Sequence, residues 1–420
     1  MEILNSYLSG LIMPVLLIIL GIFFALKLKF FYILHPLKTV QSVLNNRKNG
    51  FKALSVALAG TLGVGNIVGV ASAILLGGAG SIFWMWVSAI CAMSLKYAEV
   101  YLAMKFRKEQ NGQFYGGAPY YIKEGLRKKI GLKSAYFLSL IFAVFCVINS
   151  LTTGSLVQIN SVSSLLPISP LCFGIAFTVL AFFAISGGIK RIGTVTSWLI
   201  PALTASYVFI CLTIILSNFA DVPKAISLII KDAFNLKSAV GGFCGFGFSR
   251  ALRYGVSRGV LSNEAGCGTS PAAHASSESD NPHGQGCLGI FEVFVDTILL
   301  CTLTAIVILI SVQNTVSSPM DLVIRSFEQF AGKLGGIAVT ALSVCFAFAT
   351  VICQYFYGIE ALSYVSKARA VKTFFTFIFC LVLLVGAVIP MSLMWQISDL
   401  AIAVMTIVNL ICLFVLREYF

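Results

Sequence analysis

The chain is a succession of long apolar runs separated by short polar segments. About 20 consecutive apolar residues are long enough to cross the hydrocarbon core of a bilayer as a helix. About eleven such runs can be read, near residues 8–28, 52–77, 80–104, 135–157, 170–187, 193–217, 249–281, 288–312, 335–358, 372–392 and 396–416. The pattern predicts an all-α polytopic membrane protein with about 11 transmembrane helices in a single membrane domain.

The second run is interrupted by glycine in its middle. Between Lys52 and Leu76 the run carries no charge, yet residues 60–69 read GTLGVGNIVG. Glycine costs about 1 kcal/mol relative to alanine inside a helix. Unpaired backbone amides are also costly in lipid, so unwinding is tolerated only beside protein or a water-filled cavity. The run therefore predicts a broken helix that surrounds a ligand, as in many secondary transporters.

The seventh run has a second interruption. A helical stretch over residues 251–261 meets the polar string SNEAGCG at 262–268, after which residues 269–277 can resume a helix. Inverted repeats in transporters place two broken helices at corresponding positions. We therefore expect an inverted 5+5 repeat, with five helices in 51–217 and five in 237–417. Residues 1–50 would form an extra N-terminal helix and a cytoplasmic linker.

Composition and charge support a membrane protein and argue against nucleic-acid binding. The sequence is 58% hydrophobic and only 11% charged, with a formal net charge of +13. Its basic residues lie between the apolar runs, chiefly in segments 27–52 and 105–133, and alternate from loop to loop as the positive-inside rule describes. We expect a monomer that spans a bacterial or archaeal plasma membrane many times, with the N-terminus outside and the C-terminus in the cytoplasm.

Cysteine and histidine do not form a recognisable metal or catalytic pattern. The chain has 12 cysteines, mostly inside apolar runs, and 3 histidines, and none has the spacing of metal ligands. We expect no cofactor, no metal site built from histidine and cysteine and no catalytic residue, although Cys267 and His274 are the one arrangement that suggests a membrane enzyme. Lys96 and Glu99, three residues apart, predict a local ion pair.

Three sequence motifs carry a family resemblance that covers nearly the whole chain. They are TLGVGNIVGVA at 61–71, FWMW at 83–86 with Glu99 downstream, and RGVLSNEAG at 258–266. Together they resemble the alanine/glycine:cation symporter family. That resemblance implies a leucine-transporter-type fold and inward transport of small neutral amino acids with sodium, or in some members with protons.

The chain departs from the usual pattern of this family at three positions. Val64 stands where threonine is common, Leu261 where phenylalanine is common and Gln354 where many members have tryptophan. The loss of aromatic volume and the gain of an amide suit a neutral amino acid that is larger or more polar than alanine or glycine.

The two breaks predict the binding residues. Backbone amides at a half-helix N-terminus bind carboxylates, and freed carbonyls and amide side chains accept hydrogen bonds from an ammonium group. The candidates for substrate binding are Gly63, Val64, Gly65, Gln158, Leu261, Ser262 and Gln354; those for sodium are Asn66, Ser262, Asn263 and Thr350. Glu264 and Asp296 are candidates for proton transfer or ion pairing, because ionisable residues within membrane spans are usually functional.

Other interpretations remain open for the motif and for the function. Gly65 and Gly69 form a G-x-x-x-G pattern, which is also typical of close helix packing. A proton-coupled symporter is an alternative to a sodium-coupled one, and an ion channel could also use glycine-broken helices. Accumulation of substrate against its gradient would exclude a channel, and the absence of chemical conversion would exclude an enzyme.

Overall fold

The computed structural model describes the chain except for residues 1–4, 6, 9–11, 46, 111, 164, 235–249, 312–317 and 390–391; the side chains of 47–49 and 392–395 are also not described. Parts of four expected spans and the expected start of the second repeat fall on residues that are not described, and so do the side chains of the basic residues Arg47 and Lys48. The described elements of the first half are α2 (Met13–Lys27), α3 (Phe31–Leu34), α4 (Pro36–Asn45), α5 (Arg47–Thr61), η2 (Val64–Asn66), α6 (Val68–Gly77), α7 (Ser81–Lys105), β1 (Lys108–Gln110), β2 (Gln113–Tyr115), α8 (Ala118–Ile130), α9 (Leu132–Leu151), η3 (Thr152–Leu156), α10 (Val157–Ser163), α11 (Pro170–Ile185) and α12 (Gly188–Ser217).

The second half is equally helical. Its elements are η4 (Phe219–Asp221), α13 (Val222–Ala233), α14 (Arg250–Asn263), α15 (Pro271–Ala275), α16 (Pro282–Val293), η6 (Phe294–Cys301), α17 (Thr302–Ile310), α18 (Pro319–Val365), α19 (Arg369–Gly386), α20 (Ser392–Val415) and η7 (Arg417–Tyr419). The α18 segment contains two helices joined at Gly332, whose φ of +61° departs from helical geometry.

The structure confirms the all-α polytopic membrane architecture. Among the described residues, seven helices are long and apolar enough to cross a membrane, or eight if the bent pair 50–61 and 64–77 counts as one span. Two shorter apolar helices, α2 and α11, coincide with the first and fifth expected runs. The broken pair α14 and α15 coincides with the seventh, so each run expected from hydropathy corresponds to helical structure.

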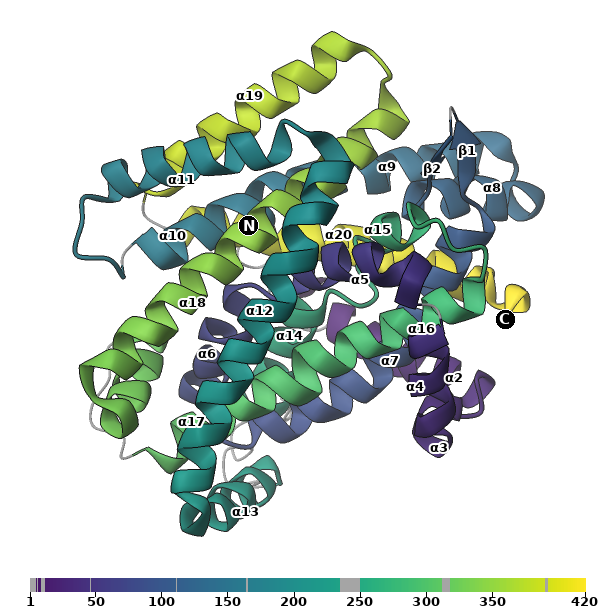
Figure 1. The fold of residues 1–420 in the computed structure, drawn as a ribbon. Coiled ribbons are helices and arrows are strands. Elements are labelled where there is room, and N and C mark those ends of the chain that lie inside the picture. Colours follow the sequence, from purple (N-terminus) through teal and green to yellow (C-terminus); the bar gives the residue numbers. More distant parts are fainter. Residues whose placement is uncertain are drawn as a thin grey trace.

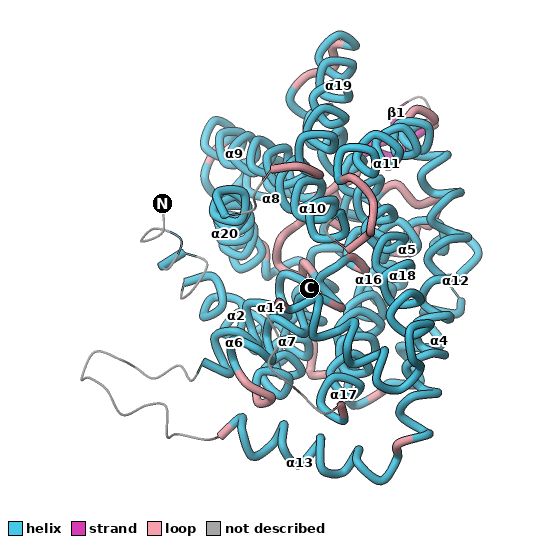
Figure 2. Tube along the Cα trace, turned by 90° about the vertical axis from the view of Figure 1, so that its left-hand side faces the viewer, coloured by secondary structure: helices cyan, strands magenta, loops and turns pink. Residues whose placement is uncertain are grey.

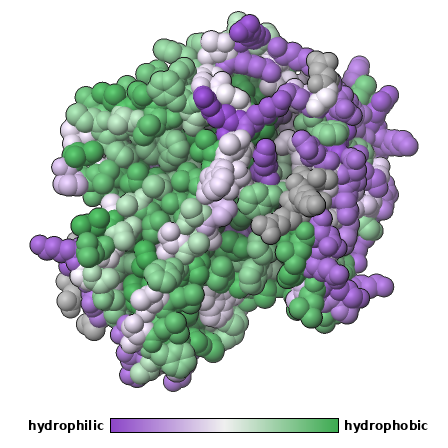
Figure 3. All heavy atoms as spheres, in the orientation of Figure 1, coloured by the Kyte–Doolittle hydropathy of each residue, from purple (hydrophilic) through white to green (hydrophobic). Residues whose placement is uncertain are grey.

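Polar structure gathers at two opposite ends of the helical body. The β1–β2 hairpin and α8 lie at one end, and the amphipathic helix α13 lies at the other (Figures 1 and 2). Between them, Figure 3 shows a broad apolar surface over the part where Figure 1 places α11, α12 and α18. Such an apolar surface between two polar ends fits a protein that is surrounded by lipid tails.

Both expected breaks are present near the middle of the fold. The helix formed by α5 bends by 58° where it passes into η2 and α6. The second break separates α14 from α15, and α14 packs against both α6 and α7. The two interruptions, about 200 residues apart in sequence, therefore lie side by side: a Cβ placed on Gly65 would lie 3.5 Å from the Cα of Ser262.

Close helix packing uses a different glycine pair from the one suggested by the sequence. A Cβ on Gly69 would meet no atom within 4 Å, so this glycine does not serve close packing. On α14, by contrast, a Cβ on Gly255 would lie 2.2 Å from the carbonyl oxygen of Ser81, and one on Gly259 would lie 2.6 Å from Ser88 Oγ. The small residues that let α14 approach α7 are therefore Gly255 and Gly259.

This contrast gives a matched pair of variants. We expect Gly255→Ala to destabilise the protein by about 1–3 kcal/mol, because the added methyl group collides with backbone. Gly69→Ala should leave stability unchanged or raise it, since alanine is the better helix former. Thermal unfolding of both purified variants in the same detergent measures the difference, and equal melting temperatures would contradict the packing assigned to Gly255.

Candidate functional site

The first break exposes its backbone to an amide and a hydroxyl from two other helices. The α5 helix ends at Thr61, and the N–H of Val64 donates a hydrogen bond to Gln158 Oε1 on α10 at 3.1 Å. A Cβ on Gly63 would lie 2.7 Å from Thr350 Oγ1 and 2.8 Å from Gln158 Oε1. Glycine is therefore required at position 63, because Gln158 and Thr350 lie directly against the chain.

The second break is a tight turn with left-handed backbone. Glu264, Gly266 and Gly268 have φ values of +49°, +82° and +76°. For glycine this conformation is easily adopted, but for glutamate it is uncommon and costs about 1–3 kcal/mol. Strained residues of this kind cluster at functional sites, where the surrounding contacts over-determine them.

Two buried polar side chains fix the backbone of this second turn. Glu99 Oε1, on α7, accepts a hydrogen bond from the N–H of Gly268 at 3.0 Å. Asn409, on α20, donates from Nδ2 to the carbonyl oxygen of Gly266 at 2.9 Å and to the same Glu99 oxygen at 2.5 Å. Tyr121 completes the chain by donating to Asn409 Oδ1. These contacts satisfy backbone groups that the break would otherwise leave unpaired in an apolar interior.

The strongest connection between the two breaks is the carboxylate of Asp296. We use the name Asp296 cluster for Asn66, Ser262, Asn263, Asp296 and Thr297, all of them buried. Asn66 Nδ2, from the first break, donates to Asp296 Oδ1 at 2.7 Å, and Ser262 Oγ, from the second, donates to Oδ2 at 2.9 Å. Thr297 Oγ1 also donates to Oδ2 at 2.7 Å and accepts from Asn263 Nδ2 at 3.2 Å. One carboxylate therefore binds both broken helices.

A second acidic residue links the turn to α18. Glu264 Oε2 accepts a hydrogen bond from Thr269 Oγ1 at 2.5 Å, and its Oε1 accepts one from Gln354 Nε2 at 2.8 Å. Gln354 also packs tightly against the opposite helix, since a Cβ on Gly154 would lie 2.5 Å from its Cβ. Glu264 thus connects the second break to α18, the helix that contacts the first break through Thr350.

Three buried acceptors at the site have no hydrogen-bond partner among the described residues. They are Asn66 Oδ1 in the Asp296 cluster, Glu99 Oε2 at the second turn and Gln354 Oε1 beside Glu264. Leaving a buried acceptor unpaired costs about 1–3 kcal/mol, and each such group requires an explanation. Oxygen atoms of this kind are suited to a cation or to a ligand that donates hydrogen bonds.

Short π-helical segments orient the side chains of two neighbouring helices. The η3 segment contains Gly154 and the η6 segment contains Asp296, Thr297 and Cys301. A π-helical turn adds a residue to the turn, shifts the following side chains around the axis and is frequent at functional sites. In η6 this shift accompanies the inward placement of Asp296 and Thr297, both completely buried.

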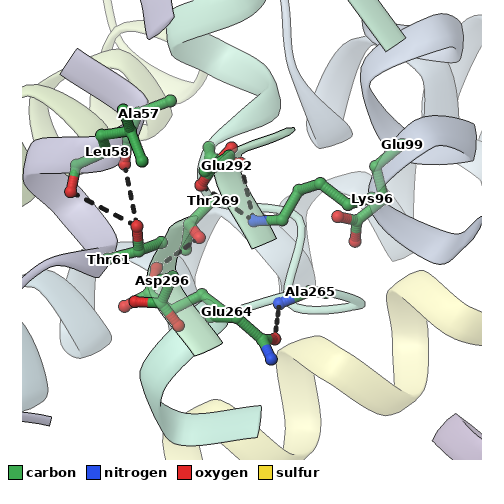
Figure 4. Close-up of polar contacts among 12 residues, drawn as sticks. Ala57, Leu58, Thr61, Lys96, Glu99, Glu264, Ala265, Thr269, Glu292 and Asp296 are labelled. Carbon is green, nitrogen blue, oxygen red and sulfur yellow. Dashed lines mark hydrogen bonds and ion pairs between the residues drawn. The ribbon is translucent and has the colours of Figure 1, made fainter. Parts of the chain in front are cut away.

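A separate buried charge cluster supports the segment that follows the second break. Lys96 Nζ lies 3.2 Å from Glu292 Oε1 and donates to Ser270 Oγ at 2.9 Å. The other Glu292 oxygen lies 3.3 Å from His274 Nε2, and His274 Nδ1 lies 2.8 Å from Gln285 Oε1. Figure 4 shows Lys96 extending toward Glu292 between α7 and α16. The expected Lys96–Glu99 pair is therefore wrong as a local contact: the partner of Lys96 comes from another helix.

The structure brings together most of the expected site residues but divides them into three groups. Asn66, Ser262 and Asn263 join the Asp296 cluster, as described above. The second group consists of Gly63, Val64 and Gln158 together with Thr350. Thr350 contacts the first break at Gly63, and its hydroxyl donates to the carbonyl oxygen of Phe346 on its own helix. Glu264 and Gln354 form the third group.

Leu261 lies at the edge of this centre. It lines a cavity of about 130 Å³ together with Met13, Arg253, Tyr254, Ser257, Arg258, Asp399 and Ile402. Arg253 and Arg258 of α14 thus line a polar cavity beside the buried site. Cys267 and His274 do not form the pair that an enzyme would need, since Cys267 accepts from Thr406 and His274 is bound by Gln285 and Glu292.

The site residues predicted from the sequence leave out three contributors. Thr297 donates to Asp296 at 2.7 Å, Thr304 donates to the carbonyl oxygen of Asn66 at 3.0 Å, and Glu292 is the partner of Lys96. Hydroxyls and carboxylates inside an apolar run are the available signal for all three, because buried polar groups in a membrane span require partners.

A polytopic helical membrane protein in which two broken helices meet at a buried polar centre has the architecture of a secondary transporter. Comparison with known proteins assigns the family directly. The model of the sodium:alanine symporter family matches residues 1–420, and the chain belongs to that family. It is a family of transporters and not of enzymes.

Individual relatives cover almost the full chain. The sodium/alanine symporter AgcS of Methanococcus maripaludis is 35% identical, over 98% of this chain and 93% of the relative. The probable sodium/glutamine symporter GlnT of Bacillus subtilis is 33% identical, over 99% of this chain and 87% of the relative. The uncharacterized transporter YflA of Bacillus subtilis is 34% identical, over 99% of this chain and 90% of the relative. The similarity therefore extends through both breaks and all described helices.

The Lys96–Glu292 pair provides a test of the buried charge cluster. Lys96→Met should destabilise the protein by about 3–5 kcal/mol, because it leaves Glu292 as a buried charge without its cation. The double variant Lys96→Met/Glu292→Gln should recover part of that loss. Lys105→Met, an exposed lysine on the same helix, is the control and should behave as wild type in thermal unfolding. A double variant less stable than Lys96→Met would contradict the pairing.

Proposed function

We propose that the protein is a secondary active transporter that carries small neutral amino acids into the cell together with sodium, by alternating access. The observation that supports this most strongly is the Asp296 carboxylate, which accepts hydrogen bonds from Asn66 of the first break and Ser262 of the second. A cation bound there would act on both broken helices at once.

The Asp296 cluster has the chemistry of a sodium site. Hard cations prefer oxygen ligands, above all carboxylates, carbonyls and amide oxygens. Asp296, Ser262 and Thr297 present such oxygens within one buried group. Asn66 Nδ2 now donates to Asp296, and rotation of this amide would turn its unpaired Oδ1 toward the same space. A bound sodium ion would take over from the hydrogen-bond donors that stabilise the Asp296 carboxylate in this structure, which are Asn66, Ser262 and Thr297.

The amino acid would bind between the first break and α18. The N–H of Val64 donates to the amide oxygen of Gln158, and a substrate carboxylate is the stronger acceptor for that N–H because a charged acceptor forms a stronger hydrogen bond. The ammonium group needs oxygen acceptors, which Gln158 and carbonyls near Leu261 and Ser262 would provide. Gln354 Oε1, buried and unpaired among the described residues, would accept a hydrogen bond from a polar substrate side chain.

Coupling follows from the shared framework. Ser262 belongs both to the Asp296 cluster and to the break that would bind the ammonium group, and Asn66 follows directly on the amides at 63–65 that would bind the carboxylate. If sodium orders these segments, the amino acid binds a site that is already formed, and by thermodynamic linkage each ligand strengthens binding of the other.

The same proposal includes the arrangement in the membrane. Residues 51–217 and 237–417 would form the two inverted five-helix halves, which would rock around the central site. With the N-terminus outside and the C-terminus in the cytoplasm of a bacterial or archaeal cell, the cavity beside Leu261 would face the outside, and β1, β2 and α8 would face the cytoplasm. The protein would act as a monomer.

Proton coupling is the second candidate, and it rests on the same carboxylate. A proton on Asp296 would neutralise the charge as sodium does and would still leave hydrogen bonds to Ser262 and Thr297 possible. Identical geometry thus serves either ion, and the driving gradient must be measured.

The decisive experiment is uptake into proteoliposomes of purified protein. A panel of radiolabelled neutral amino acids, including alanine, glycine, serine and glutamine, is offered with an inward gradient of sodium, of potassium or of protons. We expect accumulation with sodium alone, with the unmodified amino acid recovered inside. Accumulation driven only by protons would transfer the coupling role to a proton on Asp296, and the absence of any accumulation by folded protein would contradict the proposal.

Ser262→Ala tests the Asp296 cluster without removing its charge. Loss of this hydroxyl should raise the sodium concentration for half-maximal uptake about tenfold. The reason is that the ion loses one oxygen ligand, which contributes about 1.5 kcal/mol to the free energy of sodium binding. Ser343→Ala is the matched control, because Ser343 is a buried serine of α18 that donates only to Val339 of its own helix. Equal sodium dependence in the two variants would remove Ser262 from the ion site.

A further inference from the structure

A basic pocket lies far from the two breaks, at the polar end of the molecule formed by the hairpin. It has a volume of about 310 Å³ and lies between β1, β2 and α8 on one side and the junction of α18 and α19 on the other. Figure 1 places the hairpin beside this junction, and Figure 3 shows hydrophilic residues gathered on this part of the surface. The residues that line it are Lys108, Gln110, Tyr115, Tyr120, Lys123, Glu124, Ser363, Tyr364, Lys367 and Lys372.

The pocket has an excess of positive charge. Its lining has four lysines and one carboxylate, Glu124, which pairs with Lys108 at 2.8 Å. Lys123, Lys367 and Lys372 remain, and they converge from α8, from the α18–α19 junction and from α19. Lys367 Nζ donates only a long hydrogen bond of 3.3 Å to the neutral Gln110, and Lys123 Nζ lies 5.0 Å from the ring of Tyr136. Neither contact neutralises a charge.

The walls of the pocket include tyrosine side chains that contact one another and carry hydroxyl groups. Tyr364 and Ser139 share a hydrogen bond of 2.7 Å, and the rings of Tyr120 and Tyr364 pack edge to face at 5.1 Å. Glu360 is a further carboxylate nearby: it is half-buried, lines a small cavity together with Tyr120, and interacts electrostatically with Lys372. Even when Glu360 is counted, the cationic groups outnumber the acidic ones, so a ligand with more than one negative charge complements the pocket best.

We propose that this pocket binds a phosphate-bearing anion. Lysine ammonium groups are strong phosphate ligands, and three of them with phenol hydroxyls offer donors around a group that has several acceptor oxygens. On the face that the charge pattern predicts to be cytoplasmic, the source is either the headgroup of an anionic lipid, since that leaflet carries negative charge, or a soluble phosphate compound. The proposal does not depend on the coupling ion or on the transported amino acid.

Binding would have a structural consequence, because the pocket joins separate parts of the fold. Tyr120 lines this pocket and also a small cavity of about 10 Å³, whose other lining residues include Gly268 and Thr269 beside the second break. An anion held by Lys123 and Lys372 would tie α8 to α19 next to that cavity.

The test compares wild type with Lys123→Gln/Lys372→Gln, using full-length protein. The matched control is Lys133→Gln/Lys190→Gln, which removes two exposed lysines outside the pocket. Thermal unfolding in detergent is measured against inorganic phosphate at constant ionic strength, with chloride as the balancing salt. In parallel, nanodiscs of phosphatidylcholine with or without phosphatidylglycerol are used, and the lipid retained after extraction is identified by native mass spectrometry.

We expect a saturable stabilisation of wild type and of the control, and an apparent affinity about tenfold or more weaker in the pocket variant, because two charged hydrogen bonds are lost. A response to inorganic phosphate would identify a soluble ligand as sufficient. A response only to phosphatidylglycerol, with that lipid retained by wild type and control but not by the pocket variant, would identify the lipid headgroup as the source. No saturable response to either anion, or an equal loss in the pocket and control variants, would overturn the proposal.

Discussion

The organisation of this transporter depends on one buried carboxylate. Asp296 is completely enclosed, and its two oxygens accept hydrogen bonds from Asn66 in the first broken helix, from Ser262 in the second and from the neighbouring Thr297. A buried carboxylate is costly unless it is paired or well hydrogen-bonded. The breaks provide these donors, and the carboxylate in turn fixes two unwound segments that lipid alone would not tolerate.

The remaining polar contacts hold the second break in place from three directions. Glu99 and Asn409 bind its backbone, Glu264 connects it to Gln354 on α18, and Lys96 with Glu292 fixes the short helix that follows. Because these contacts come from four helices, α7, α16, α18 and α20, movement of any of these helices changes the turn. A site built in this way can respond to a bound ion and transmit the response to the surrounding helices, as alternating access requires.

Hydropathy and glycine placement predicted the helical spans and both breaks, because those features are local in sequence. The partners of particular side chains were less predictable. Lys96 and Glu99 share a helix face by spacing, yet Lys96 pairs with Glu292, 196 residues away, because the packing of α16 on α7 brings a second carboxylate closer. Gly65–Gly69 and Gly255–Gly259 have identical spacing, but only in the second pair would a Cβ at each glycine lie closer than 3 Å to an atom of another helix. The π-helical turn that accompanies the inward placement of Asp296 leaves no recognisable pattern in the sequence.

The central claim is that the Asp296 cluster binds the coupling ion, and direct binding of radioactive sodium to purified protein tests it. Wild type should bind sodium saturably, with an affinity that increases when the transported amino acid is present. Asp296→Asn, which keeps the shape of the side chain and removes its charge, should lose that binding while remaining folded by thermal unfolding. Sodium binding of unchanged affinity in folded Asp296→Asn would contradict the account.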